Sequence, residues 1–157
     1  MTEGSSVIRP LRDDEYDLFI GRGLAFYVSD MVAAGIDPDV AQAKADRDLP
    51  QLLPDGLATP DHFMYAIEDD GQFAGYLWLC DRGGELGHSL FVYAIEVDEA
   101  FRGRGLGRAA MQFTEEEARR RGIAKIALNV FGGNAAARRL YLSLGYQETA
   151  IHMEKRV

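Results

Sequence analysis

The stretch that decides the fold reads Val97-Asp-Glu-Ala-Phe-Arg-Gly-Arg-Gly-Leu-Gly107. It directly follows Leu90–Val97 (LFVYAIEV), which is apolar except for Glu96 and therefore predicts a central strand covered on both faces. Apolar residues at helical spacing then predict a helix over residues 106–121. The segment is thus a strand, a glycine-rich turn and a helix in succession.

The turn has the chemistry of an anion site. Glycines at positions 103, 105 and 107 let a ligand approach the backbone closely. The first N–H groups of the helix that follows have no partner within it, and together with the helix dipole they attract an anion. Three arginines add fixed positive charge: Arg102, Arg104 and Arg108. These features together predict a pyrophosphate site.

A dinucleotide site is the competing interpretation of these glycines. The spacing Gly105-x-Gly107-x-x-Ala110 matches the pattern of dinucleotide-binding folds. Those folds carry an acidic residue about 20 positions later, which binds the ribose. Here that region reads Lys125-Ile-Ala-Leu-Asn129, and the turn lies past the middle of the chain. The sequence therefore argues against dinucleotide binding.

The chain before this segment predicts three strands and two helices. A strand is expected over 7–11, and a hairpin over 62–68 and 73–80. The first helix is expected to run to Gly35 from N-caps at Asp13 and Asp14, and the second from Asp37 and Pro38 towards Leu53.

The chain after the turn alternates helix, strand and helix. A strand is expected over 124–130, a helix over 134–144 and an extended end over 146–155. The whole pattern predicts an α/β (α+β) fold, in which residues 1–157 form one domain with a mixed central sheet.

Composition limits the class of protein. The chain has 157 residues with 47% hydrophobic and 27% charged residues, as in ordinary globular domains. No apolar run approaches the roughly 20 residues that span a membrane, and no secretory signal precedes the first strand. Cys80 is the only cysteine, so no internal disulfide can form. We expect a cytoplasmic protein with no membrane partner.

The charges divide unevenly along the chain. The net charge of −8 argues against nucleic acid as a partner. Residues 1–100 carry a net charge of −14, whereas residues 101–157 carry +6. Such asymmetry suggests two ligands of opposite sign, although two solvated surfaces would give the same totals.

Two blocks of sequence together resemble the GNAT superfamily of acetyl-CoA-dependent N-acyltransferases. The first block is Arg102-Gly-Arg-Gly105-Leu-Gly107, which is similar to the family's pyrophosphate motif. The second runs from Leu128 through Asn134 and Tyr141 to Gly145-Tyr146, as a strand, an asparagine and a helix that ends Tyr-x-x-x-Gly-Tyr. The resemblance is close over about residues 90–150.

The resemblance implies a sheet that splays at its fourth strand, Leu90–Val97, and is flanked by helices on both faces. Residues of about 1–89 would form the acceptor side, and about 90–150 the part that binds acetyl-CoA, a co-substrate. The implied acetyl-CoA-binding residues are Val97, Arg102, Gly103, Arg104, Gly105, Leu106, Gly107, Arg108 and Asn134. A homodimer is implied only by what is common in the family.

Two side chains are candidates for catalysis. The resemblance puts Tyr141 near the thioester sulfur as an acid for the leaving thiolate; the alternative is a core aromatic, since Ala137, Leu140 and Leu144 share its helical face. The backbone N–H of Val97 is the expected donor to the oxyanion. Glu96 is the candidate general base, and strand alternation puts it on the same face as Leu90, Val92 and Ala94.

Alternatives to Glu96 stay open. A lone carboxylate in an apolar strand is also typical of a hydrogen-bonded structural group, and an ordered water can serve as the base. Loop residue His88 is a weaker candidate for proton transfer.

The expected reaction is direct transfer of the acetyl group to a primary amine in a ternary complex. The acidic first part of the chain favours a cationic acceptor, either a small-molecule amine or a protein N-terminus or lysine. Phe26, Tyr27 and Asn129 are expected to contact it. No cluster of His, Cys and carboxylates has metal-ligand spacing, so no metal is expected. The alternative function is a non-catalytic acyl-CoA sensor, which would need neither Glu96 nor Tyr141.

Overall fold

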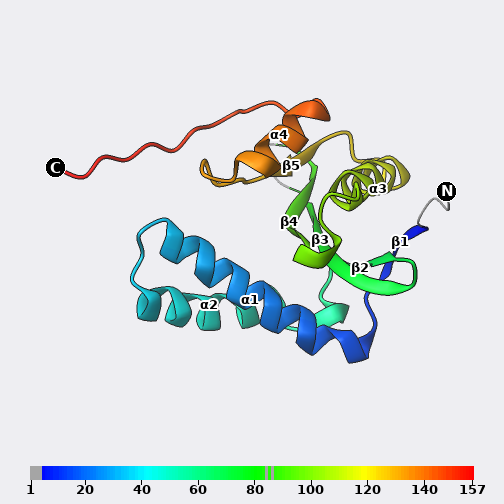
Figure 1. The fold of residues 1–157 in the computed structure, drawn as a ribbon, viewed down its shortest axis with the longest axis horizontal. Coiled ribbons are helices and arrows are strands. Elements are labelled where there is room, and N and C mark those ends of the chain that lie inside the picture. Colours follow the sequence, from blue (N-terminus) through cyan, green and yellow to red (C-terminus); the bar gives the residue numbers. More distant parts are fainter. Residues whose placement is uncertain (1–4, 84, 86) are drawn as a thin grey trace.

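The computed structural model describes residues 5–83, 85 and 87–157 (Figure 1). The strands are β1 (Ser6–Pro10), β2 (His62–Asp69), β3 (Gln72–Arg82), β4 (Ser89–Val97) and β5 (Ile126–Leu128). The α-helices are α1 (Tyr16–Ala33), α2 (Pro38–Leu52), α3 (Leu106–Arg120) and α4 (Ala135–Ser143). Short 3-10 turns lie at Asp13–Glu15, Gly56–Ala58 and Glu99–Phe101.

The strands form one mixed sheet in the order β1-β2-β3-β4-β5. The first three pairings are antiparallel, and β4 pairs with β5 in parallel. Only Leu90–Val92 of β4 pairs with β5, so residues 93–97 have no strand partner on that side among the described residues. The sheet therefore splays at its fourth strand, as the family resemblance implied.

Helices cover both faces of this sheet (Figure 1). On one face Leu77 and Val92 pack against Ala110 and Met111 of α3. On the other, Tyr76 packs edge-on against Phe19 of α1, with ring centroids 4.9 Å apart. The C-terminal half of α1 extends past the sheet and lies side by side with α2 (Figure 1).

A β-bulge in β4 changes which side chains face which helices. Trp78 pairs with Ala94 and Leu79 pairs with Val92, so Tyr93 is an extra residue in β4. Val92 therefore packs on the α3 side while Ala94 packs on the α1 side. Glu96, two residues after Ala94, lies on the α1 face. Its predicted placement beside Leu90 and Val92 is wrong, because simple alternation does not anticipate the bulge.

Several predicted boundaries need correction. Asp13 and Asp14 are not helix N-caps; they lie in the 3-10 turn, and α1 begins at Tyr16 with no side-chain cap. Strand β5 has three residues instead of seven. Strand β4 is covered on both faces only over its first half, since residues 93–97 are half-buried. The cap at Asp37 is confirmed, because its carboxylate accepts from the N–H groups of Asp39 and Val40.

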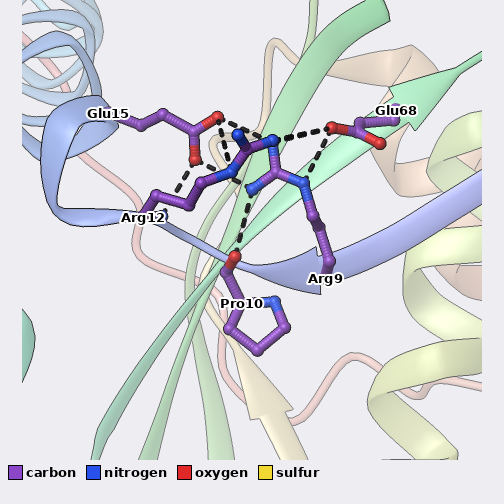
Figure 2. Close-up of polar contacts among 5 residues, drawn as sticks. All are labelled: Arg9, Pro10, Arg12, Glu15 and Glu68. Atoms are coloured by element: carbon purple, nitrogen blue, oxygen red, sulfur yellow. Dashed lines mark hydrogen bonds and ion pairs between the residues drawn. The ribbon is translucent and has the colours of Figure 1, made fainter. Parts of the chain in front are cut away.

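An ion-pair network ties the first strand to the start of α1 (Figure 2). Arg9 of β1 donates through Nε to Glu68 of β2 at 2.7 Å and through Nη2 to Glu15 at 2.6 Å. Glu15 also accepts from the N–H of Arg12 at 2.9 Å. The hydrogen bond from Arg9 lowers the pKa of Glu15 to about 2. The network fixes the point at which the chain leaves the sheet to form α1.

The chain ends beyond α4 in a segment without helix or strand, residues 146–157, as expected from the sequence (Figure 1). Within the described part of the chain, no helix is both long and apolar enough to span a membrane.

Candidate active site

The splay between β4 and β5 opens into a cavity of about 1130 Å³. One wall comes from α1, α2, β3 and β4, which belong to the first part of the chain and the central strand. The other comes from the turn before α3, the end of β5 and α4. The cavity therefore joins the two parts of the chain that carry opposite charge.

The N-terminus of α3 provides free backbone N–H groups at this cavity. Gly105 precedes the helix with φ of 81°, a left-handed conformation that glycine adopts without strain. The first residue to bond within the helix is Ala109, whose N–H donates to the carbonyl of Gly105 at 3.0 Å. The N–H groups of residues 106–108 precede this bond and are available to an anion. Gly103, Gly105, Leu106 and Gly107 all line the cavity.

The three arginines of this turn have different surroundings. Arg102 lines the cavity, and its Nε donates to the carbonyl of Val97 at 3.0 Å. Arg104 turns towards Asp69 of β2, with an ion pair of 2.8 Å. Arg108 donates to the hydroxyl of Ser143 at 2.9 Å. The structure thus brings Arg102 to the cavity but directs Arg104 and Arg108 to other partners.

The end of β4 directs a backbone donor into the splay. The N–H of Asp98 donates to the carbonyl of Ala74 on β3 at 2.8 Å. Because successive N–H groups of a strand point to opposite sides, the N–H of Val97 points away from β3 and towards the side that β5 does not reach. Val97 is among the residues that line the cavity.

Helix α4 supplies Asn134 and Tyr141. The side chain of Asn134 caps the helix by accepting from the N–H of Ala137 at 3.1 Å, and the residue lines the cavity. Tyr141 is 9% exposed and also lines the cavity. Burial raises the pKa of Tyr141, so its hydroxyl is protonated at neutral pH and can donate a proton.

Glu96 and Tyr76 face each other across β4 and β3. They are direct cross-strand partners, and both line the cavity. Tyr76 is fully buried, and burial, followed by a hydrogen bond with the Glu96 carboxylate, raises its pKa. The Tyr76 hydroxyl and Glu96 Oε2 thus place two buried polar atoms on one wall of the cavity. A few polar groups in a largely apolar wall are typical of a ligand site.

The remaining wall is rich in aromatic side chains. Phe26 and Tyr27 of α1 line it, whereas Asn129 lines the opposite wall at the end of β5; that these three contact the acceptor stays a prediction. Trp78 and Tyr93 also line the aromatic wall and stack with ring centroids 4.8 Å apart. Neither these two residues nor Tyr76 were predicted from the sequence as site residues. Alternation along β3 places Tyr76 and Trp78 on one face, but the bulge that turns Tyr93 towards them has no signal in the sequence.

The structure gives the histidines and acidic residues no metal-binding arrangement. Across residues 5–83, 85 and 87–157, no three His, Cys, Asp or Glu side chains are grouped to hold a metal ion. His88 lies outside the cavity lining and is paired with Asp81.

Comparison with known proteins identifies the family of this chain. Residues 31–146 match the model of the acetyltransferase (GNAT) family. The chain belongs to this family, and it is therefore an acyltransferase. N-acetyltransferase YycN of Bacillus subtilis is 30% identical over 153 residues, which cover 96% of this chain and 98% of YycN.

Solved structures agree with the assignment. The crystal structure of YycN has a TM-score of 0.90 and covers 98% of this chain and 99% of its own. An acetyltransferase of Clostridium acetobutylicum, solved with acetyl-CoA, has a TM-score of 0.70 at 18% identity and covers 97% of this chain and 96% of its own. At 18% identity, the similarity to the Clostridium acetobutylicum structure shows a shared fold only. Both extend over nearly the whole chain, so the shared fold includes residues of about 1–89.

Proposed function

We propose that this acetyltransferase moves the acetyl group of acetyl-CoA directly to a primary amine within a ternary complex. The observation that carries the proposal is the single cavity that contains both the N-terminus of α3 and the pair Glu96 and Tyr141. Residues before about 89 contribute the acceptor wall, and residues of about 90–150 contribute the acetyl-CoA wall. This arrangement supports simultaneous binding of both substrates.

The acetyl-CoA wall suits a pyrophosphate next to an extended chain. The N–H groups of residues 106–108 and the side chain of Arg102 are donors for phosphate oxygens. No other atom lies within 4 Å of where a Cβ would stand on Gly103 or Gly105, so the turn is open to a ligand. The unpaired edge of β4 and Asn134 then offer polar groups along the splay.

Acetyl-CoA supplies the activated acetyl group, and the residues of this chain handle the protons. Glu96 accepts a proton from the incoming ammonium, which frees the nitrogen lone pair. The Val97 N–H donates to the carbonyl oxygen as negative charge grows there. The carbon–nitrogen bond forms, the carbon–sulfur bond breaks, and Tyr141 gives its proton to the leaving sulfur. The second proton lost by the nitrogen restores Tyr141, and Glu96 releases its own to solvent.

Binding of acetyl-CoA can be tested at the turn. Replacing Arg102 by alanine removes a charged donor at the cavity, so we expect acetyl-CoA to bind about tenfold more weakly. Isothermal calorimetry measures this, with Arg119→Ala as control because Arg119 pairs with Glu115 on the exposed side of α3. Equal weakening in both variants would mean that only overall charge matters, and the proposed site would be wrong.

A homodimer and a cytoplasmic location stay predictions. The sensor alternative gains no support from a cavity that both catalytic candidates line.

A further inference from the structure

The cavity continues beyond the reacting groups along α1. Gly23, Tyr27 and Asp30 all line it, and their spacing of i, i+4 and i+7 places them on one face of the helix. Figure 1 shows the C-terminal half of α1 running past the sheet, so this face leads away from β4. The wall between Gly23 and Asp30 is formed by apolar and aromatic side chains, among them Leu24, Phe26 and Tyr27.

The reacting end of this wall lies at Gly23. A Cβ on Gly23 would stand 3.9 Å from the Tyr76 hydroxyl, which is the cross-strand neighbour of Glu96. Asp30 follows seven residues later, which corresponds to about 10 Å along a helix that rises about 1.5 Å per residue. Asp30 thus lies roughly two helical turns from the reacting end. Of the three carboxylates that line the cavity, Asp30, Asp48 and Glu96, Asp48 is already paired with Lys44.

Asp30 has an uncompensated charge in this position. Among the described residues, no Lys, Arg or His forms an ion pair with it, and Lys44 of the neighbouring helix α2 pairs with Asp48 instead. Arg82, a cation that lines the cavity, donates to the hydroxyl of Tyr93 at 2.7 Å. Burial raises the pKa of Asp30.

Helix stability does not explain Asp30 either. It lies in the last turn of α1, where the helix dipole disfavours a negative charge. Asp30 is half-buried, has no paired cation and lies at the helix end that disfavours negative charge. Such a carboxylate lowers the stability of the protein unless a ligand neutralises it. The ligand that fits carries a positive charge.

We propose that the acceptor is a linear di- or polyamine. Its reacting amine lies between Glu96 and Tyr76, and a second ammonium about 10 Å away is bound by Asp30. The methylene chain between them packs against the aromatic wall at Phe26 and Tyr27. Such a separation corresponds to roughly eight or nine bonds of extended chain. The inference rests on the proposed function, and the second ammonium takes no part in the bond changes described there.

A pair of amines that differ by one nitrogen tests this inference. 1,8-Diaminooctane carries two amines at the inferred separation, and octylamine is the same chain with one. Thiol release from acetyl-CoA gives kcat/KM for each. We expect the wild-type protein to favour the diamine by at least about tenfold. In Asp30→Asn the preference falls to about twofold or less, whereas Asp17→Asn, at an exposed position of α1 outside the cavity, retains it.

The outcomes separate this inference from the proposed function. Equal kcat/KM for the two amines, or a diamine preference that survives in Asp30→Asn, would overturn the role of Asp30 while leaving the transferase reaction in place. If neither amine releases thiol but another amine in a wider panel does, the polyamine class is wrong and the proposed function stands. If acetyl-CoA does not bind in calorimetry, the proposed function fails and this inference fails with it.

Discussion

Glu96 shows how one side chain acquires a role from its surroundings. It stands opposite Tyr76 on the α1 face of the sheet, with one carboxylate oxygen buried at the cavity wall. A carboxylate in this position can accept a proton from an amine that enters the cavity. This is why we propose Glu96 as the base.

Replacement of Glu96 by glutamine tests this assignment. The amide has the same shape but cannot accept the proton, so we expect kcat to fall about 100-fold. Steady-state thiol release with a saturating amine measures this. Glu99→Gln, at an exposed position in the turn after β4, is the control and should stay close to wild type. Turnover in Glu96→Gln close to that of wild type would assign the base to another group.

At the scale of the elements, the close approach of β3 and β4 depends on Gly75. A Cβ there would stand 2.0 Å from the carbonyl oxygen of Glu96, which is far inside contact distance. Gly75→Ala therefore has to separate the strands, and we expect a loss of about 3 kcal/mol in unfolding free energy. Urea unfolding measures this. Gly83→Ala, where a Cβ meets no atom within 4 Å, should be within about 0.5 kcal/mol of wild type. Equal losses in the two variants would contradict the account.

The same elements show what can be predicted from the sequence. The strand, turn and helix around Gly105 are local, so apolar spacing and glycine chemistry predict them. The order of strands and helices predicts the mixed sheet, and the family resemblance implies its splay. The bulge at Tyr93 depends on pairing between strands, so the sequence misplaces Glu96 relative to Val92. Likewise, Arg104 finds Asp69, 35 residues earlier in the chain, a partner that no motif indicates.

At the scale of the whole molecule, the network of Arg9, Glu15 and Glu68 links the sheet to the start of α1 (Figure 2). The pKa of Glu15 is lowered to about 2 from 4.5, so the folded state favours its charged form. Its contribution to stability is therefore fully present above about pH 4.5 and is lost as the pH falls towards 2. Lowering the pH from 4.5 towards 2 should therefore weaken the attachment of α1 to the sheet, whereas the attachment is intact at neutral pH.

Glu15→Gln measures this contribution. We expect the variant to be about 2 kcal/mol less stable than wild type at pH 7, with the difference shrinking between pH 4.5 and pH 2. Urea unfolding at several pH values gives the curve, and Asp14→Asn, at an exposed position in the same turn, is the control. A difference that does not change with pH would mean that Glu15 acts through packing alone.

The central claim is amine-dependent acetyl transfer with Tyr141 as the acid, and its most direct measurement is thiol release from acetyl-CoA with and without amines. The account predicts release that requires an amine, falls at least about 100-fold in Tyr141→Phe, and leaves acetyl-CoA affinity nearly unchanged in calorimetry. Equal turnover in wild type and Tyr141→Phe, or acetyl-CoA that binds while no amine in a broad panel releases thiol, would contradict it.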